Sequence, residues 1–287
     1  MFFARMTKNK AILEILLCSG LWSIAGIFMK LIPWSGFAIA GARGIFAAGV
    51  MAAFMALRRL SFTLTRRSAF GGLCLCGTMT LFAVANKATT AANAIVLQFT
   101  APIWIMLISG LLLHRRFRPR DKLAAALTLA GIALCFADGL GAGNLKGDCV
   151  AVGSGLCLAC YYISLEGSPE DERMTSVLVA HCLTVVIGLP VFLAERPPLS
   201  AAALGSVAVL GIFQLGVPYV LLAHASGWVS PLVISLLSAL EPLLNPLWVA
   251  IFDGEAPGPA AMAGAALVVA TVTVWCVFDR KHEKTAT

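Results

Sequence analysis

Charged residues are scarce in this chain. Asp, Glu, Lys and Arg together make up 12% of its 287 residues, whereas 60% are hydrophobic. A soluble globular domain carries about 25% charged residues. The mean hydropathy is +0.90, because apolar stretches of about 20 residues, long enough to cross a bilayer, follow one another along nearly the whole sequence. The low charge excludes a separate soluble domain and indicates an integral membrane protein.

The motifs of several enzyme classes are also missing. The sequence has no H-E-x-x-H zinc-protease motif, no GxxxxGK[ST] phosphate-binding loop and no GxGxxG dinucleotide fingerprint. No serine has a glycine two positions before it, as the nucleophile of a rhomboid-like protease would. The nine cysteines are odd in number, and Cys157-x-x-Cys160 has no companion pair, so neither a metal site nor a redox centre is expected.

Charged residues, glycines and prolines mark the ends of ten expected transmembrane helices. They span residues 11–31, 36–57, 68–86, 90–113, 121–138, 147–165, 174–194, 201–222, 229–252 and 259–279. With the N-terminus in the cytoplasm, sixteen lysines and arginines lie on the cytoplasmic side and four on the outer side, as the positive-inside rule requires. The expected location is therefore the cell (inner) membrane with both termini cytoplasmic. The net charge of +7 reflects this topology and does not indicate nucleic-acid binding.

The two halves of the sequence resemble each other at an offset of 140 residues. Pro102 then aligns with Pro242, and Pro119 aligns with Pro259. Each half contains five expected helices, and an odd number makes the second half insert in the opposite orientation. The sequence therefore predicts an all-α membrane protein of ten transmembrane helices, arranged as two inverted five-helix repeats over residues 1–140 and 141–287. This architecture is common in secondary transporters, with the site near the membrane midplane.

Four segments carry a resemblance to a known family. They are "GLWSIAG" (20–26), "AGARGIFAAG" (40–49), "TTAANAIVLQFTAPIWIMLISGLLLHRR" (89–116) and "LVISLLSALEP" (232–242). With its length and its repeat, the chain resembles the drug/metabolite transporter (DMT) superfamily, EamA-type, over its whole extent. The resemblance implies a transporter of amino acids, sugars, nucleotide derivatives or other small metabolites, in many cases directed outward.

Two charged residues fall well inside expected helices, where an ionised group needs a cavity or a partner. Glu241 lies near the middle of the ninth helix, and we expect it to be the exchangeable charge of a central cavity. The structural alternatives are a permanent ion pair, with Arg43 of the second helix as the partner, or a neutral carboxyl that caps a freed carbonyl. Arg43 itself is expected to snorkel outward, to pair with a carboxylate or to contact the substrate.

Other polar residues in the helices are expected to have structural roles. Glu14 should be solvated at the membrane interface or paired with Lys10, and His224 should be solvated at a helix end. No function is expected for His181 in the seventh helix.

Prolines interrupt two helices that correspond in the repeat. Pro102 and Pro242 have no N–H, so the carbonyls of Gln98 and Ser238 lose their helical partners. Inside a membrane such groups must be satisfied by protein, water or ligand. We therefore expect Pro102 and Pro242 to act as hinges, and Gln98, Ser238 and Asn245 to contribute to the binding site. The alternative is a pair of static kinks.

Aromatic side chains are expected to line the same cavity. The candidates are Trp22, Tyr161 and Tyr219, although aromatic residues in helices more often serve packing. The expected partners are a small-molecule substrate and membrane lipid, with protons and a second copy of the chain as further expectations. No cofactor or metal is expected.

These observations predict a secondary active transporter. It would export small polar metabolites such as amino acids, driven by protons or another gradient, by alternating access through the central cavity. The alternative is an importer or exchanger of a cationic metabolite of the quaternary amine type, matched to Glu241 and the aromatic residues. A passive channel and an intramembrane enzyme are less favoured.

Overall fold

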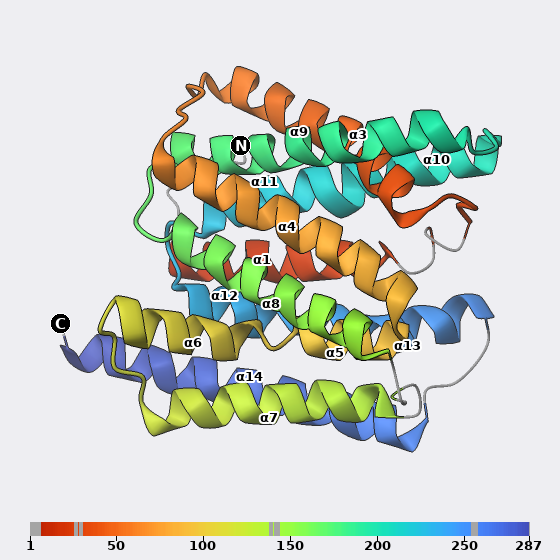
Figure 1. The fold of residues 1–287 in the computed structure, drawn as a ribbon. Coiled ribbons are helices and arrows are strands. Elements are labelled where there is room, and N and C mark those ends of the chain that lie inside the picture. Colours follow the sequence, from red (N-terminus) through yellow and green to blue (C-terminus); the bar gives the residue numbers. More distant parts are fainter. Residues whose placement is uncertain are drawn as a thin grey trace.

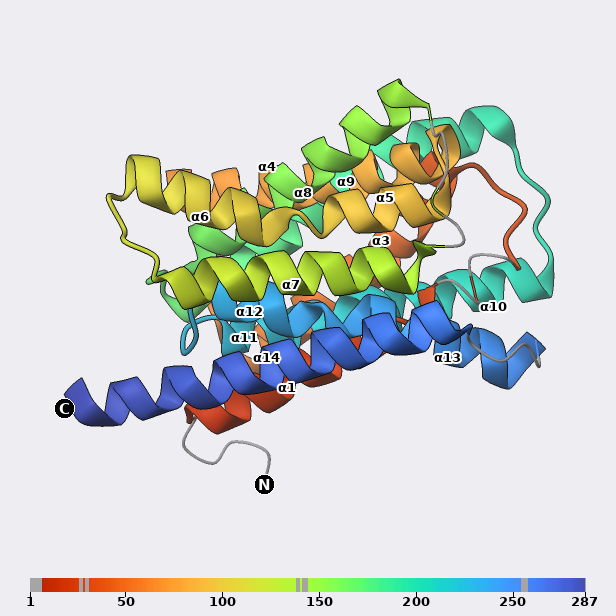
Figure 2. The same cartoon turned by 90° about the horizontal axis from the view of Figure 1, so that it is seen from below.

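The chain folds into an elongated bundle of helices joined by short loops (Figures 1 and 2). The structure is a computed structural model that describes residues 7–25, 28, 31–137, 140, 144–253 and 258–286, and no strand occurs among them. In chain order the helices are α1 (Lys8–Trp22), α3 (Gly36–Arg58), α4 (Arg66–Ala88), α5 (Ala91–Gln98), α6 (Ala101–Leu112), α7 (Pro119–Cys135), α8 (Leu145–Leu165), α9 (Glu170–Glu195), α10 (Ala201–Val209), the π-helical segment η2 (Leu210–Gly216), α11 (Val217–Ala225), α12 (Pro231–Ser238), α13 (Leu240–Asp253) and α14 (Pro259–Ala286).

The predicted all-α membrane fold is confirmed. Among the described residues, seven helical stretches are long and apolar enough to cross a membrane. One of these stretches combines α5 with α6, and another runs from α10 through η2 to α11. The start of α1, the α6–α7 connection and the C-terminal end of α14 lie at the same end of the bundle, on the left in Figure 1.

Several helix boundaries differ from the predicted ones. The first helix ends at Trp22 rather than at residue 31, and Ser23, its C-cap, donates a hydrogen bond from Oγ to the carbonyl of Gly20 at 2.7 Å. The seventh predicted helix begins at Glu170 rather than at residue 174. The prediction leaves the acidic sequence after Pro169 in a loop, but three carboxylates in a first turn favour a helix because they face its positive end.

The fourth and ninth predicted helices are each broken into two. The first break separates α5 from α6 between Gln98 and Ala101, and the second separates α12 from α13 at Ala239. With the 140-residue offset the two breaks coincide, and in each case a proline follows closely, at Pro102 and Pro242. Both interruptions thus fall where the prolines predicted them, because both segments leave helical geometry just before the proline.

Each break has a carbonyl that a side-chain hydroxyl satisfies. Thr100 Oγ1 donates a hydrogen bond to the carbonyl of Leu97 at 2.6 Å. At the equivalent position of the second half, Ser19 Oγ lies 3.3 Å from the carbonyl oxygen of Leu237 and 2.9 Å from that of Ile15, and its one proton is shared between the two. The first hydroxyl belongs to the broken segment itself, whereas the second comes from α1.

The eighth predicted helix is distorted in its middle. Residues 210–216 form a π-helical segment in which the N–H of Val217 donates to the carbonyl of Ile212, five residues earlier. Pro218 follows directly and has no N–H for the carbonyl of Gln214, which accounts for the wider turn. The helix predicted over 201–222 is thus irregular and continues to Ala225.

Glycines allow two close crossings on α3. A Cβ placed on Gly188 of α9 would lie 2.4 Å from the carbonyl oxygen of Phe37 and 2.5 Å from the backbone of Gly41. On the same helix, a Cβ on Gly211 of η2 would lie 2.6 Å from the carbonyl oxygen of Arg43. Because no side chain fits at these points, α9 and η2 both pack backbone to backbone against α3, on either side of Arg43.

Candidate functional site

All three tyrosines of the chain meet Trp22 in the interior of the bundle. The ring centroids of Trp22 and Tyr219 are 5.3 Å apart, those of Tyr161 and Tyr219 are 6.4 Å apart, and those of Tyr161 and Tyr162 are 5.8 Å apart. The rings are tilted or edge-on, as aromatic pairs prefer. We call these four residues the aromatic cluster; all four are buried. The structure therefore brings together the three aromatic residues that the sequence suggested as cavity walls.

Glu241 lies at one edge of the aromatic cluster, in the first turn of α13. Tyr162 and Ser238 approach each other at 3.4 Å between their hydroxyl oxygens, which joins the cluster to the break before α13. The carboxyl group of Glu241 is close enough to Tyr162 and Tyr219 to interact electrostatically with both. The predicted residues Glu241 and Ser238 are thus neighbours of the cluster, on either side of the break that precedes Pro242.

Arg43 lies at another edge of the cluster and is buried, with 7% of its surface exposed. Its NH1 donates a hydrogen bond to Gln214 Oε1 at 3.3 Å. The expectation that it snorkels outward is wrong, because α9 and η2 pack closely against α3 on both sides of it. Among the described side chains no carboxylate lies within 4.0 Å of Arg43, so an ion pair with Glu241 does not form in this structure.

Several buried polar atoms around Tyr219 have no hydrogen-bond partner among the described residues. They are Trp22 Nε1, Arg43 Nε, the Tyr161 hydroxyl, and both ring nitrogens of His181. The His181 ring stands edge-on to Tyr219, with centroids 5.7 Å apart. Leaving one such group unsatisfied costs about 1–3 kcal/mol. Four helices therefore present polar atoms without partners to one small interior region.

Gln98 is not part of this arrangement. Gln98 Nε2 donates to Ser154 Oγ at 3.0 Å, and Ser154 Oγ donates to the carbonyl of Thr78 at 3.0 Å. This chain of bonds ties the first helix break to α8 and α4, and its contacts do not include the aromatic cluster. The side chain of Asn245 lies outside the described residues.

Glu14 and His224 form a pair that the sequence did not predict. His224 Nδ1 lies 3.1 Å and 3.0 Å from the two carboxylate oxygens of Glu14. The pair joins α1 to α11 on the side where α1 begins. Neither residue is simply solvated, because each is the partner of the other.

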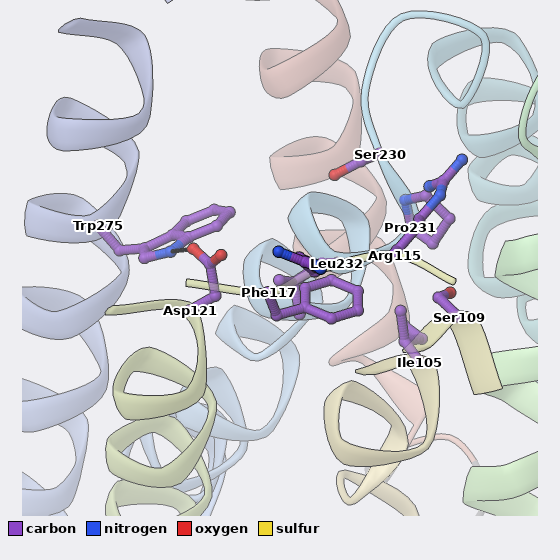
Figure 3. Close-up of a pocket in the computed structure, with 10 residues that line it drawn as sticks. Ile105, Ser109, Arg115, Phe117, Asp121, Ser230, Pro231, Leu232 and Trp275 are labelled. Atoms are coloured by element: carbon purple, nitrogen blue, oxygen red, sulfur yellow. Dashed lines mark hydrogen bonds between the residues drawn. The ribbon is translucent and has the colours of Figure 1, made fainter. Parts of the chain in front are cut away.

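A pocket of about 200 Å³ opens at the end of the bundle where α12 begins (Figure 3). Its walls include Arg115, Phe117 and Pro231, and Trp275 donates a hydrogen bond to Asp121 at 2.9 Å. Arg115 also forms an ion pair with Glu166, in which NH1 lies 2.7 Å from each carboxylate oxygen. Pro231, one of the pocket's lining residues, lies ten positions before Glu241, with the break at Ala239 between them.

Sequence reasoning missed three residues of the central region. Gln214 lies in a π-helical turn. The feature of the sequence that could have indicated this turn is Pro218, four residues after Gln214. His181 reaches the cluster because glycines bring α9 onto α3, a contact that the Gly41-x-x-Gly44 spacing indicated only weakly. Tyr162 is recognisable in the sequence as a helical aromatic residue, but nothing there assigns it to the site.

Comparisons with known proteins agree with this architecture. The EamA-like transporter family matches the chain twice, over residues 9–137 and 145–276. The threonine/homoserine exporter RhtA of Escherichia coli (strain K12) is 25% identical over 243 residues, covering 82% of this chain and 80% of the exporter. RhtA of Salmonella typhimurium (strain LT2) is 26% identical over 233 residues, covering 78% of this chain and 76% of the exporter.

A solved structure, described only as "Crystal structure of protein", has the same fold. Its TM-score is 0.82 at 20% sequence identity, covering 96% of this chain and 99% of that one. The double match to one family confirms the resemblance found in the sequence. The chain belongs to the EamA-like transporter family and is a membrane transporter of small molecules, not an enzyme.

Proposed function

We propose that the protein is a secondary active exporter of small polar metabolites, with amino acids as the first candidates. The observation that carries this proposal is the set of unpartnered polar atoms around Tyr219, closed off between helices of both halves of the chain. Trp22 comes from the first half, and Tyr161 and Tyr219 come from the second. A site between two halves suits alternating access, because movement of one half against the other opens it to either side. The exporters of threonine and homoserine that the chain resembles support the substrate class.

The architecture we propose has ten membrane crossings in two inverted repeats, residues 1–140 and 141–287. The double family match supports the repeat. So do the breaks at Gln98–Ala101 and at Ala239. α1 and α8, which open the two halves, run in opposite directions in Figure 1, as inverted repeats require. Both termini would face the cytoplasm, and the binding site would lie between the repeats.

Within this transporter Glu241 is the proposed coupling group. It lies beside the aromatic cluster at the start of a helix segment that follows a break, and no cation of the described residues pairs with it. Pro102 and Pro242 are the proposed hinges, because both breaks precede them. A carboxyl group that exchanges a proton with each side in turn would link proton movement to reorientation of the halves.

The cationic alternative is less well supported. A quaternary amine would suit Glu241 and the aromatic rings, but the buried guanidinium of Arg43 also interacts electrostatically with Tyr219. A substrate that carries only positive charge would be repelled by Arg43. A zwitterion carries a negative group that Arg43 attracts and a positive group that Glu241 attracts.

Transport by the purified protein tests the proposal. In proteoliposomes we expect uptake of labelled L-threonine or another L-amino acid to saturate with concentration, and to accelerate when unlabelled substrate is present on the opposite side. Liposomes without protein are the control for leakage. Flux that rises linearly with concentration and shows no counterflow would indicate a channel instead of a carrier.

Cysteine labelling tests the inverted topology. In a variant whose nine native cysteines are replaced, a cysteine introduced at Arg116 should react with a membrane-impermeant maleimide only from the cytoplasmic side. A cysteine introduced at Pro198 or at Glu255 should react only from the outer side. Reaction of Arg116→Cys and Glu255→Cys from the same side would rule out the inverted repeat. The placement of Glu255 lies outside the described residues, whereas Arg116 and Pro198 lie in described loops.

A further inference from the structure

Arg43 and His181 lie side by side in the closed interior, on α3 and α9. A Cβ on Gly44, the residue after Arg43, would lie 3.3 Å from the carbonyl oxygen of His181. The Arg43 guanidinium interacts electrostatically with the His181 ring and with Tyr219. His181 has no exposed surface, and Arg43 has 7%. The two side chains therefore share one location at the edge of the aromatic cluster.

This location is rich in donors and poor in negative charge. Arg43 donates from NH1 to the neutral amide oxygen of Gln214, while its Nε has no partner among the described residues. Both ring nitrogens of His181 also have no hydrogen-bond partner among the described residues. A neutral imidazole offers one donor and one acceptor, and a guanidinium offers five donors. An amide oxygen does not compensate a buried cation, so the region is suited to a ligand that brings a negative charge.

The backbone around Arg43 holds it in place for such a ligand. Gly188 lets α9 pack against α3 just before Arg43. Gly211 lets η2 approach so closely that a Cβ at this position would lie 2.6 Å from the carbonyl oxygen of Arg43. The π-helical turn then directs Gln214 to the guanidinium. π-Helical turns are frequent at functional sites because they re-aim side chains. Gln214 thus bonds to the guanidinium without neutralising it, while α9 and η2 pack against the α3 backbone next to Arg43.

We propose that Arg43, His181 and Gln214 form a carboxylate-binding subsite, which takes the α-carboxylate of the transported amino acid while Glu241 faces its ammonium group. The inference rests on the proposed transport function and deepens it by naming how the substrate is recognised. The planar fork of arginine matches a carboxylate in two parallel hydrogen bonds. The imidazole of His181 supplies a further donor, and Gln214 orients the guanidinium. The subsite requires a free carboxylate on the substrate.

An isosteric change at Gln214 tests the subsite. Gln214→Glu places a carboxylate 3.3 Å from Arg43 NH1 and so gives the guanidinium an internal partner. We expect the variant to unfold at a higher temperature than the wild type in the absence of ligand. Its affinity for L-amino acids should fall about tenfold or more, because the charge-assisted bonds to the substrate are lost. Its affinity for the corresponding amino acid amides, which have no carboxylate and carry only a positive charge, should stay the same or rise, because Arg43 no longer repels them.

The measurement is the thermal shift and equilibrium binding of the full-length protein with L-amino acids, each paired with its amide. The wild type should prefer each acid over its amide, and Arg43→Gln should abolish that preference. Arg58→Gln is the matched control, because Arg58 lies on the same helix next to Phe54 at the bundle end, and it should keep the preference. Equal binding of acid and amide by the wild type would overturn the subsite but leave the substrate class intact. If Gln214→Glu kept the wild-type preference for the acid over its amide, the subsite would likewise be overturned and the substrate class left intact. Binding of no amino acid at all would overturn the proposed function and the subsite with it.

Discussion

Replacing Glu241 with glutamine is expected to abolish proton-driven transport while the protein stays folded. Glutamine keeps the shape and the hydrogen-bonding capacity of the side chain but cannot exchange a proton. In the structure Glu241 lies beside Tyr162 and Tyr219 at the start of α13, and no cation of the described residues is within 4.0 Å of it. Removing its titration should therefore disturb coupling much more than packing. We expect transport driven by a pH gradient to fall about tenfold or more, the size of a typical coupling between sites.

The measurement is uptake into proteoliposomes with and without an imposed pH gradient, together with counterflow at equal pH on both sides. Counterflow should persist in Glu241→Gln at saturating substrate, because it needs reorientation of the loaded carrier and no net proton movement. The substrate concentration at half-maximal counterflow should rise, because Glu241 also faces the ammonium group of the substrate in the proposed subsite. Glu195→Gln, at the exposed C-terminal end of α9, is the matched control and should respond to the gradient like the wild type. If Glu241→Gln keeps the wild-type response, Glu241 is not the coupling group. If it folds only when Arg43 is also neutralised, the ion-pair alternative is correct.

Replacing Arg173 with methionine should lower the stability of the protein strongly. The sequence suggests that Arg173 is one of the cytoplasmic loop cations, but it lies inside α9 and has 7% of its surface exposed. Its Nε donates a 2.6 Å hydrogen bond to the carbonyl of Ala223, and its NH1 donates to the carbonyl of Ser168. These carbonyls lie at the C-terminal end of α11 and just beyond that of α8, where a positive charge is favourable. One side chain therefore joins the ends of three helices.

Each charge-assisted hydrogen bond of this kind contributes about 1.5–3 kcal/mol, so the loss of both should cost about 3–6 kcal/mol. For a chain of this size that corresponds to a fall in Tm of about 10 °C, which thermal unfolding of the purified protein in detergent can measure. Arg66→Met, at an exposed arginine that opens α4, is the matched control and should change Tm by no more than about 1–2 °C. Equal Tm values for the two variants would mean that Arg173 has no stabilising role.

Sequence-based prediction is most accurate where one residue type has a strong local effect. The prolines at 102 and 242 locate both helix breaks to within four residues, because a missing N–H disrupts a helix wherever it occurs. The choice of Trp22, Tyr161 and Tyr219 rests on the expectation that large aromatic residues gather in the interior of a transporter. The structure brings all three together, although their role in binding stays a prediction.

Features that depend on contacts between distant helices could not be predicted. Arg43 is expected from the sequence to reach solvent or a carboxylate, but its exit is blocked by the glycine contacts of α9 and η2. The Glu14–His224 pair joins residues 210 positions apart, and no local pattern indicates it. Gln98 is predicted to belong to the site by analogy with Glu241, yet it bonds to Ser154. The two halves share their helix breaks but not the polar groups around them.

The two helix breaks also differ in the helix that each one contacts. At the first, Thr100 carries the hydroxyl that satisfies Leu97, while Gln98 bonds to Ser154 and so ties this joint to α8. At the second, the carbonyl of Leu237 lies 3.3 Å from Ser19 Oγ on α1, so bending there changes this contact or moves α1 as well. Because α1 also carries Trp22 and Glu14, motion at the second joint is linked to the aromatic cluster and to the pair with His224. One joint is thus bonded to α8, and the other contacts α1. We expect the inward and outward reorientation steps to proceed at different rates.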